Sequence, residues 1–151
     1  MAELKERLRA DLNAAMRARD QVRMRTLRMA LTSITNEEVA GAAARDLTDD
    51  EVLKVLTREA RKRREAAEAF SAAGRSDQAA AERAEGDVLA GYLPAQLSDD
   101  ELAALVDAAI AETGASGMAS MGQVMKTVTP RIAGRADGAR VAAEVRRRLS
   151  G

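Results

Sequence analysis

The chain has 151 residues, and its 24 lysines and arginines balance 24 aspartates and glutamates, so the formal net charge is zero. Hydrophobic residues make up 46% of the sequence and aromatic residues only 1%, so the core must be built from aliphatic side chains that suit helix packing. Cysteine and histidine are absent, which excludes disulfides, zinc sites built on these residues and nucleophilic systems that need histidine.

The composition also predicts the fold class. Ala, Arg, Glu and Leu are abundant and β-branched residues are sparse, which favours helix along the whole chain. No segment approaches the roughly 20 apolar residues that a membrane span needs, and the first residues contain no apolar signal-peptide core. We therefore expect an all-α, soluble, cytoplasmic protein without a membrane segment.

Two apolar stripes open the chain. The first repeats every four residues and indicates a helix with one buried face, made of Leu4, Leu8, Leu12 and Met16. Asp20 is suited to cap a second helix. The second stripe advances in steps of three and four residues through Met24, Leu27, Leu31 and Ile34. Each stripe predicts a helix that buries one side only.

Two later helix starts carry the same local signal. Thr48 is followed by Glu51, and Ser98 is followed by Glu101, so each hydroxyl residue precedes a glutamate by three positions. This spacing predicts a capping box, in which the hydroxyl and the carboxylate satisfy backbone N–H groups at the helix start. The first of these helices should run from Asp49 to about residue 73.

The clearest boundary in the chain follows a further predicted helix over residues 77–91. Pro94 cannot continue a helix, and it disfavours the helical conformation at Leu93. We expect an N-terminal helical unit over residues 1–92 and a compact C-terminal unit over residues 93–151.

The C-terminal unit should contain three helices, over residues 99–112, about 120–132 and 138–149. Pro130 should bend or shorten the end of the second one. Each helix has about three turns, which is too short to persist alone in water. The unit therefore has to be held together by the packing of its apolar stripes.

The sequence offers no catalytic residue. The two acidic clusters, residues 49–51 and 99–101, are explained by helix capping. The pairs Glu65/Glu68 and Glu82/Glu85 have the spacing of a metal-binding helix face, but such bundle sites usually add a histidine. No phosphate-binding glycine loop is present. We predict no catalytic residue, no metal and no cofactor.

Charge is segregated along the chain. Residues 1–30 carry eight basic and four acidic side chains, and residues 54–64 carry six basic and one acidic. Residues 98–112 carry five acidic and no basic side chains, whereas residues 126–148 carry seven basic and two acidic ones. The basic side chains could attract an anionic partner, or they could be solvated helix faces that complement helix dipoles.

A predicted turn at residues 134–138 lies among four of these basic residues, Lys126, Arg131, Arg135 and Arg140. Gly134 is suited to close one helix, and Asp137 is suited to cap the next. A capped turn explains these residues fully. The same geometry also offers free N–H groups at a helix start, with Gly138 leaving room for an anion such as phosphate.

These C-terminal residues resemble the signature of the GatB/YqeY family. The resemblance rests on MGQVMK at residues 121–126, GRADG at residues 134–138 and the apolar positions Val141, Val145 and Leu149. Upstream, Leu27-Arg28-Met29, the helix after Thr48 and the boundary at Tyr92-Leu93-Pro94 are similar to the stand-alone YqeY members. The resemblance covers essentially the whole chain.

The resemblance implies a helical unit followed by a tail domain like that of the B subunit of glutamyl/aspartyl-tRNA amidotransferase, where the tail contacts tRNA. Family labels of carbon–nitrogen ligase activity with glutamine as amido-N-donor fit that enzyme's catalytic body, which this chain lacks. We therefore expect a non-catalytic accessory protein that binds tRNA phosphates through Lys126, Arg131, Arg135 and Arg140. Gly134, Asp137 and Gly138 would hold the turn. The alternative is a protein–protein adaptor without RNA binding.

Overall fold

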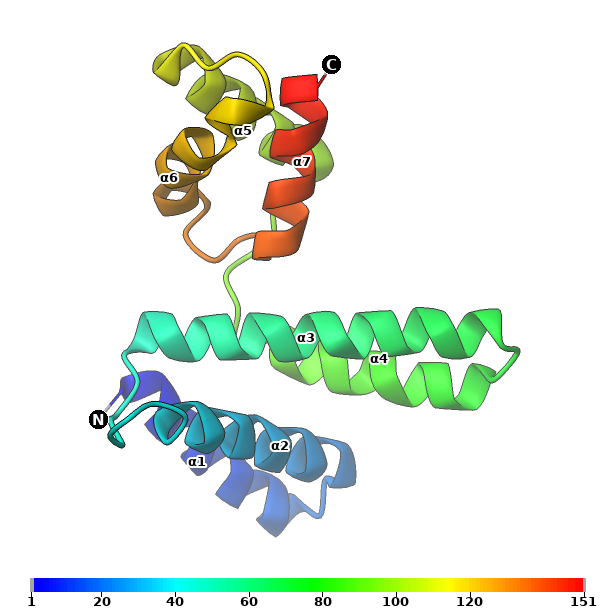
Figure 1. The fold of residues 1–151 in the computed structure, drawn as a ribbon. Helices are drawn as coiled ribbons and strands as arrows, with labels where there is room; N and C mark the ends of the chain where they lie inside the picture. The colour runs from blue at the N-terminus through cyan, green and yellow to red at the C-terminus, as the bar shows by residue number, and fades with distance from the viewer. Residues whose placement is uncertain (1, 151) are drawn as a thin grey trace. The chain divides into compact units, whose positions relative to one another are not determined.

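The structure is a computed structural model that describes residues 2–150. Within this range the chain forms seven α-helices and one 3-10 turn and contains no β-strand, which confirms the all-α prediction (Figure 1). The chain divides into two compact units, residues 1–93 and 94–151. The elements are α1 (Glu3–Ala18), α2 (Gln21–Glu38), α3 (Asp49–Ala72), α4 (Ser76–Ala90), α5 (Asp99–Thr113), η1 (Met118–Ser120), α6 (Met121–Ile132) and α7 (Gly138–Ser150).

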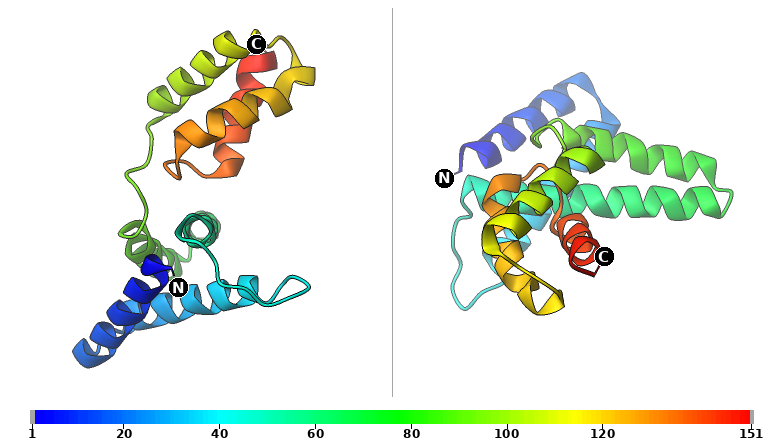
Figure 2. Two further views of the ribbon diagram at one scale, coloured as in Figure 1. Left: turned by 90° about the vertical axis from the view of Figure 1, so that its left-hand side faces the viewer. Right: turned by 90° about the horizontal axis from the view of Figure 1, so that it is seen from above.

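The N-terminal unit is made of two helical hairpins. Helices α3 and α4 run side by side in opposite directions, and α1 and α2 form the second pair (Figures 1 and 2). Helix α2 contacts both α3 and α4. Gly86 lies inside α4 and faces α3, where an added Cβ would lie 3.7 Å from the Cβ of Arg63. A glycine in the helix is thus compatible with close packing of the hairpin.

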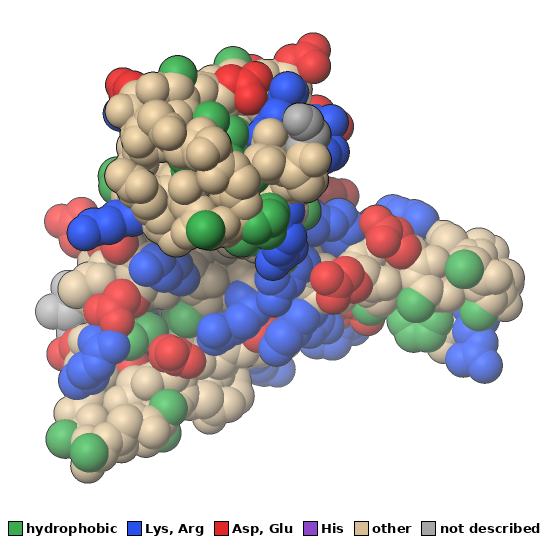
Figure 3. Space-filling view, turned by 45° about the horizontal axis from the view of Figure 1, so that its top comes forward, with side chains coloured by type: hydrophobic (Ala, Val, Ile, Leu, Met, Phe, Trp, Pro, Cys, Tyr) green, Lys and Arg blue, Asp and Glu red, His purple; other side chains and the backbone are tan. Residues whose placement is uncertain are grey.

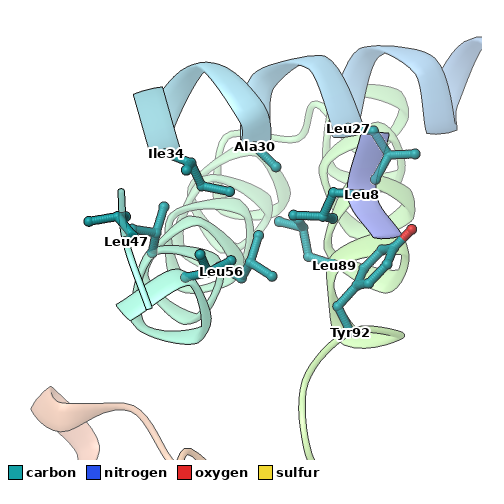
Figure 4. Close-up of a cluster of buried hydrophobic side chains, with 10 residues drawn as sticks. Leu8, Leu27, Ala30, Ile34, Leu47, Leu56, Leu89 and Tyr92 are labelled. Carbon is teal, nitrogen blue, oxygen red and sulfur yellow. The ribbon is translucent and has the colours of Figure 1, made fainter. Parts of the chain in front are cut away.

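The core of this unit is aliphatic, with one tyrosine at its edge. Figure 4 shows the side chains of α1, α2, α3 and α4 pointing toward one another, with a further leucine from the segment before α3. The labelled members are Leu8, Leu27, Ala30, Ile34, Leu47, Leu56, Leu89 and Tyr92.

The buried face of α1 differs from the predicted stripe. Met16 is 38% exposed, whereas Ala15 and even Lys5 are buried. The prediction for Met16 was wrong because the last turn of α1 presents Ala15 to the core. The sulfur of Met16 instead accepts a hydrogen bond from Arg28, at 3.4 Å.

Lys5 is buried because it meets a carboxylate from α2. Its Nζ donates to both oxygens of Glu38, at 2.8 and 2.9 Å. Glu38 also accepts from the backbone N–H of Leu47, at 3.4 Å. The hydrogen bond from Lys5 holds the pKa of Glu38 below its usual range against the opposing effect of burial. This pair ties α1, α2 and the segment before α3 together.

In the C-terminal unit, α5, α6 and α7 contact one another pairwise around a separate aliphatic core. Helix α6 continues through Pro130 and ends at Ile132, so the proline does not shorten it. Among the described helices, none is long and apolar enough to cross a membrane. The buried members of the core of the C-terminal unit are Leu97, Leu102, Val106, Ala109, Val124, Val128, Ile132, Ala136, Val141 and Val145.

Local capping signals are confirmed at the predicted positions. Thr48 and Glu51 form a capping box at the start of α3, and Ser98 and Glu101 form one at the start of α5. Asp20 accepts from the backbone N–H of Arg23 and so caps α2. These starts depend on neighbours only three residues apart, which is why the sequence alone reveals them.

Truncation of the core should be costly. We expect Leu56→Ala to lower the free energy of unfolding by about 2–5 kcal/mol, because Leu56 is fully buried between helices. Met16→Ala, at an exposed position, should change it by no more than about 0.5 kcal/mol. Urea unfolding followed by circular dichroism measures both. Equal losses of unfolding free energy in the two variants would contradict the placement of Leu56 in the core and of Met16 at the surface.

The Lys5–Glu38 pair should make stability depend on pH. Because the pKa of Glu38 is lowered on folding from its ordinary value of 4.5, its stabilising effect is present above that pH and is lost as the pH falls through the folded value. Glu38→Gln would leave Lys5 buried without a counter-charge and should lower the free energy of unfolding by about 3 kcal/mol at pH 7.

The control for the Lys5–Glu38 pair is Glu6→Gln. This substitution breaks the exposed ion pair between Glu6 and Arg9, which lie on α1 as Lys5 does. It should change stability by no more than about 1 kcal/mol. Urea midpoints measured between about pH 7 and pH 3 should show a shallower acid-induced loss for Glu38→Gln than for the unaltered protein. Parallel curves for the two proteins would refute the role of Glu38.

Candidate functional site

The turn between α6 and α7 has a backbone that favours glycine. Ala133 and Gly134 both adopt the left-handed conformation, with φ of 51° and 78°. At the other end, Asp137 is buried and its Oδ1 accepts from the backbone N–H of Arg140, at 3.0 Å. Gly134 therefore stands just past the end of α6, and Asp137 caps the start of α7.

The same turn holds the first residues of the C-terminal unit. The backbone N–H of Leu97 donates to the carbonyl of Arg135, at 2.8 Å. The side chain of Gln96 donates to the carbonyls of Pro94 and Gly134, at 2.9 and 3.4 Å. An added Cβ at Gly134 would lie 3.7 Å from the Pro94 ring. The turn thus anchors the segment that leads into α5, a role that the sequence did not suggest.

Arg135 is used within the fold. Its Nε donates to the carbonyl of Ile132 at 3.1 Å, and its Nη2 donates to the carbonyl of Arg131 at 2.7 Å. These carbonyls lie at the C-terminal end of α6, where a positive charge is favourable. These two hydrogen bonds use two of the five N–H donors of the guanidinium, and the other three can still donate to a phosphate.

Two other predicted cations are paired with carboxylates of α5. Arg140 donates to Asp99 at 2.8 Å, and Arg131 pairs with Glu112. The side chains of Asp99 and Glu112 are 97% and 55% exposed. Exposed pairs of this kind contribute only about 0–1 kcal/mol, so an anion can replace the carboxylate at small cost.

Among the four predicted cations, Lys126 and Arg131 are exposed, whereas Arg135 and Arg140 are half-buried. Lys126 lies on the side of α6 away from the buried Val124 and Val128. Within residues 2–150 it forms no ion pair or side-chain hydrogen bond. The structure therefore does not bring the four predicted cations together as one free cluster.

The segregated charges of this unit face each other. Arg148 pairs with Asp107 at 3.4 Å, in addition to the pairs made by Arg131 and Arg140. Arg147 and Arg148 also bind Glu144, and their hydrogen bonds hold the pKa of that carboxyl below its usual range. Much of the basic segment is thus neutralised by the acidic helix α5. The one-dimensional charge pattern could not show this.

One of the two glutamate pairs considered as metal ligands, Glu82/Glu85, is bound by arginines. Glu85 binds Arg25 at 2.7 Å, and both Glu82 and Glu85 lie 3.5 Å from Arg63. Glu59 is buried beside them and accepts from Ser33 at 3.0 Å. In the described part of the chain, no group of three or more acidic side chains is arranged to hold a metal ion. These carboxylates form a buried charge network that joins α2, α3 and α4.

Comparison with known proteins agrees with the resemblance seen in the sequence. Residues 5–149 match the family described as Yqey-like protein. A curated relative from Pyrenophora tritici-repentis (strain Pt-1C-BFP), named altered inheritance of mitochondria protein 41, mitochondrial, is 36% identical over 134 residues. The alignment spans 86% of this chain and 71% of that protein. The chain therefore belongs to the YqeY-like protein family.

Proposed function

We propose that this chain is a non-catalytic accessory protein that binds tRNA through backbone phosphates. The observation that carries the proposal is the weak engagement of the exposed cations on α6 and α7. Lys126 is exposed, and the carboxylate partners of Arg131 and Arg140 are themselves largely exposed. Phosphate oxygens can replace such carboxylates as acceptors at little cost.

The scarcity of aromatic side chains favours double-stranded over single-stranded RNA as the ligand. Recognition of single strands relies on aromatic side chains on which bases stack. The chain has one phenylalanine and one tyrosine, and Tyr92 is buried. Double-stranded RNA is recognised mainly by its shape and by phosphate and 2′-hydroxyl contacts, which suits a surface of cations. The folded arms of tRNA provide such duplexes.

We further propose that a carbon–nitrogen ligase label, where relatives carry one, reflects likeness to the tail of the amidotransferase B subunit. In this fold the two acidic clusters start helices α3 and α5, and Glu82 and Glu85 pair with Arg63. We also propose a cytoplasmic site of action, with which the absence of cysteine is compatible.

One observation favours a second function, that of a protein–protein adaptor. Met118 in η1 is 46% exposed, and Met121 and Met125 are half-buried nearby in the sequence. Flexible methionine side chains suit adaptable protein contacts. A stoichiometric protein partner that persists after nuclease treatment, together with no affinity for tRNA, would favour this function.

Salt dependence tests the tRNA proposal. The purified protein should shift total tRNA in a gel at low salt, and log K should fall linearly with log salt. Lys126→Gln should weaken binding and reduce the slope by about 0.7–0.9 if Lys126 contacts one phosphate. The control Arg75→Gln removes the same charge from the start of α4. Absence of any shift at low salt would rule out the proposal.

Arg135 should respond differently from Lys126. Because its guanidinium binds the last carbonyls of α6, Arg135→Gln should lower the free energy of unfolding by about 1 kcal/mol. Lys126→Gln should leave stability within about 0.5 kcal/mol of the unaltered protein. Urea unfolding measures both. Unchanged stability of Arg135→Gln, combined with lost tRNA binding, would instead assign Arg135 to RNA contact.

A further inference from the structure

Helix α3 carries a second concentration of positive charge, outside the turn at residues 134–138. Residues 54–64 contain six basic side chains and one acidic one. Lys54, Arg58 and Arg61 follow each other in steps of four and three, so they occupy successive turns of one helix face. We call these three side chains the α3 cation row.

The row lies on the side of α3 that faces solvent. The buried side of the same helix presents Val52, Val55 and Leu56 to the core. Lys54 and Arg58 are exposed and Arg61 is half-buried. Figure 3 shows Lys and Arg side chains gathered along the part of the N-terminal unit where α3 runs. The row is thus a surface feature of this unit alone.

The cations of the row are only weakly engaged. Within residues 2–150, Lys54 makes no ion pair or side-chain hydrogen bond. Arg58 lies 3.4 Å from Glu37, and both side chains are about half-exposed. Arg61 lies 3.9 Å from Glu65, whose side chain is 65% exposed. Such contacts contribute about 0–1 kcal/mol, so the row is available to an anion.

The backbone beneath the row is held firmly. Glu59, the residue after Arg58, is buried and accepts a hydrogen bond from Ser33 of α2 at 3.0 Å. Glu59 also pairs with Lys62 and Arg63 of its own helix, at 3.3 and 3.4 Å. Arg63 continues the network to α4 through Glu82 and Glu85. Because α3 is fixed to α2 and α4, only side chains need to be ordered when the row binds.

The spacing of the row suits a phosphate backbone. With a rise of about 1.5 Å per residue, its three cations are separated by about 6 and 4.5 Å along the helix. One strand of a DNA duplex carries a phosphate about every 3.4 Å along the axis, so a row about 10.5 Å long extends over about three phosphates. Within residues 54–61 the exposed side chains are Lys54 and Arg58, and neither is apolar or aromatic. A helix that lies on a membrane needs an apolar face, and single-strand binding needs aromatic stacking.

We propose that the α3 cation row is a second phosphate-contacting surface, which binds the backbone of a duplex arm of the same tRNA. This proposal rests on the proposed function and assigns part of the contact to the N-terminal unit. It predicts that binding depends on residues on both units of the chain.

The test uses the full chain and total tRNA. The triple variant Lys54→Gln, Arg58→Gln, Arg61→Gln should weaken binding at least about tenfold near 0.1 M salt and reduce the slope of log K against log salt by about 2–3. The control is Arg17→Gln, Arg19→Gln, Arg75→Gln, which removes the same charge from other exposed positions of the N-terminal unit. Circular dichroism and urea midpoints should confirm that both variants fold.

The outcomes separate this proposal from the proposed function. Weaker tRNA binding by the α3 triple variant, with unchanged binding by the control variant, supports the proposed role of the α3 cation row. An equal loss of tRNA affinity in both variants means that only total charge matters, and it overturns the proposed role of the α3 cation row. If the α3 triple variant binds normally while Lys126→Gln binds weakly, the row is refuted and the proposed function stands. If the unaltered chain binds no tRNA, both fail.

The same variants also test two other classes of partner, a membrane surface and an acidic protein. Binding of the unaltered chain to vesicles rich in phosphatidylserine, lost in the α3 triple variant while tRNA binding is retained, would overturn the RNA assignment in favour of a membrane surface. A nuclease-resistant protein complex that is lost only in the α3 triple variant would overturn it in favour of an acidic protein.

Discussion

Opposite charges that lie far apart in the sequence are brought together by helix packing, and this pairing determines which cations remain open to a partner. In the C-terminal unit, α5 supplies Asp99, Asp107 and Glu112 to arginines of α6 and α7. In the N-terminal unit, Arg63 and its glutamates join three helices. A chain with no net charge and few aromatic side chains therefore uses ion pairs both to orient its helices and to leave a few cations exposed.

Features governed by near neighbours could be predicted from the sequence. The helix starts at Asp49 and Asp99 follow from capping residues three positions apart, and the apolar steps identified most helices. Burial could not be predicted in the same way. Lys5 is buried because Glu38, 33 residues away, is placed beside it, while Met16 is exposed although it continues the stripe of α1. Such outcomes depend on which helices meet.

The candidate site shows the same limit. The residue types at the 134–138 turn suggested a phosphate site, but the structure shows that these residues make hydrogen bonds within the fold. Arg135 binds the end of α6, and the carbonyls of Gly134 and Arg135 hold the segment that leads into α5. A sequence signature can therefore mark a structural anchor as well as a contact surface. Cations without internal partners within residues 2–150, such as Lys54 and Lys126, are therefore the residues that we propose for contact.

The proposed contact between weakly paired cations of both units and the phosphates of tRNA can be observed in solution. Backbone amide chemical shifts, followed during titration with a tRNA, report which residues are near the RNA. We expect salt-sensitive perturbations clustered along residues 54–61 of α3 and around Lys126 and Arg131 of α6. Perturbations confined to the methionines of η1 and the start of α6, or none at a tRNA concentration that saturates a low-salt gel shift, would contradict the proposed contact.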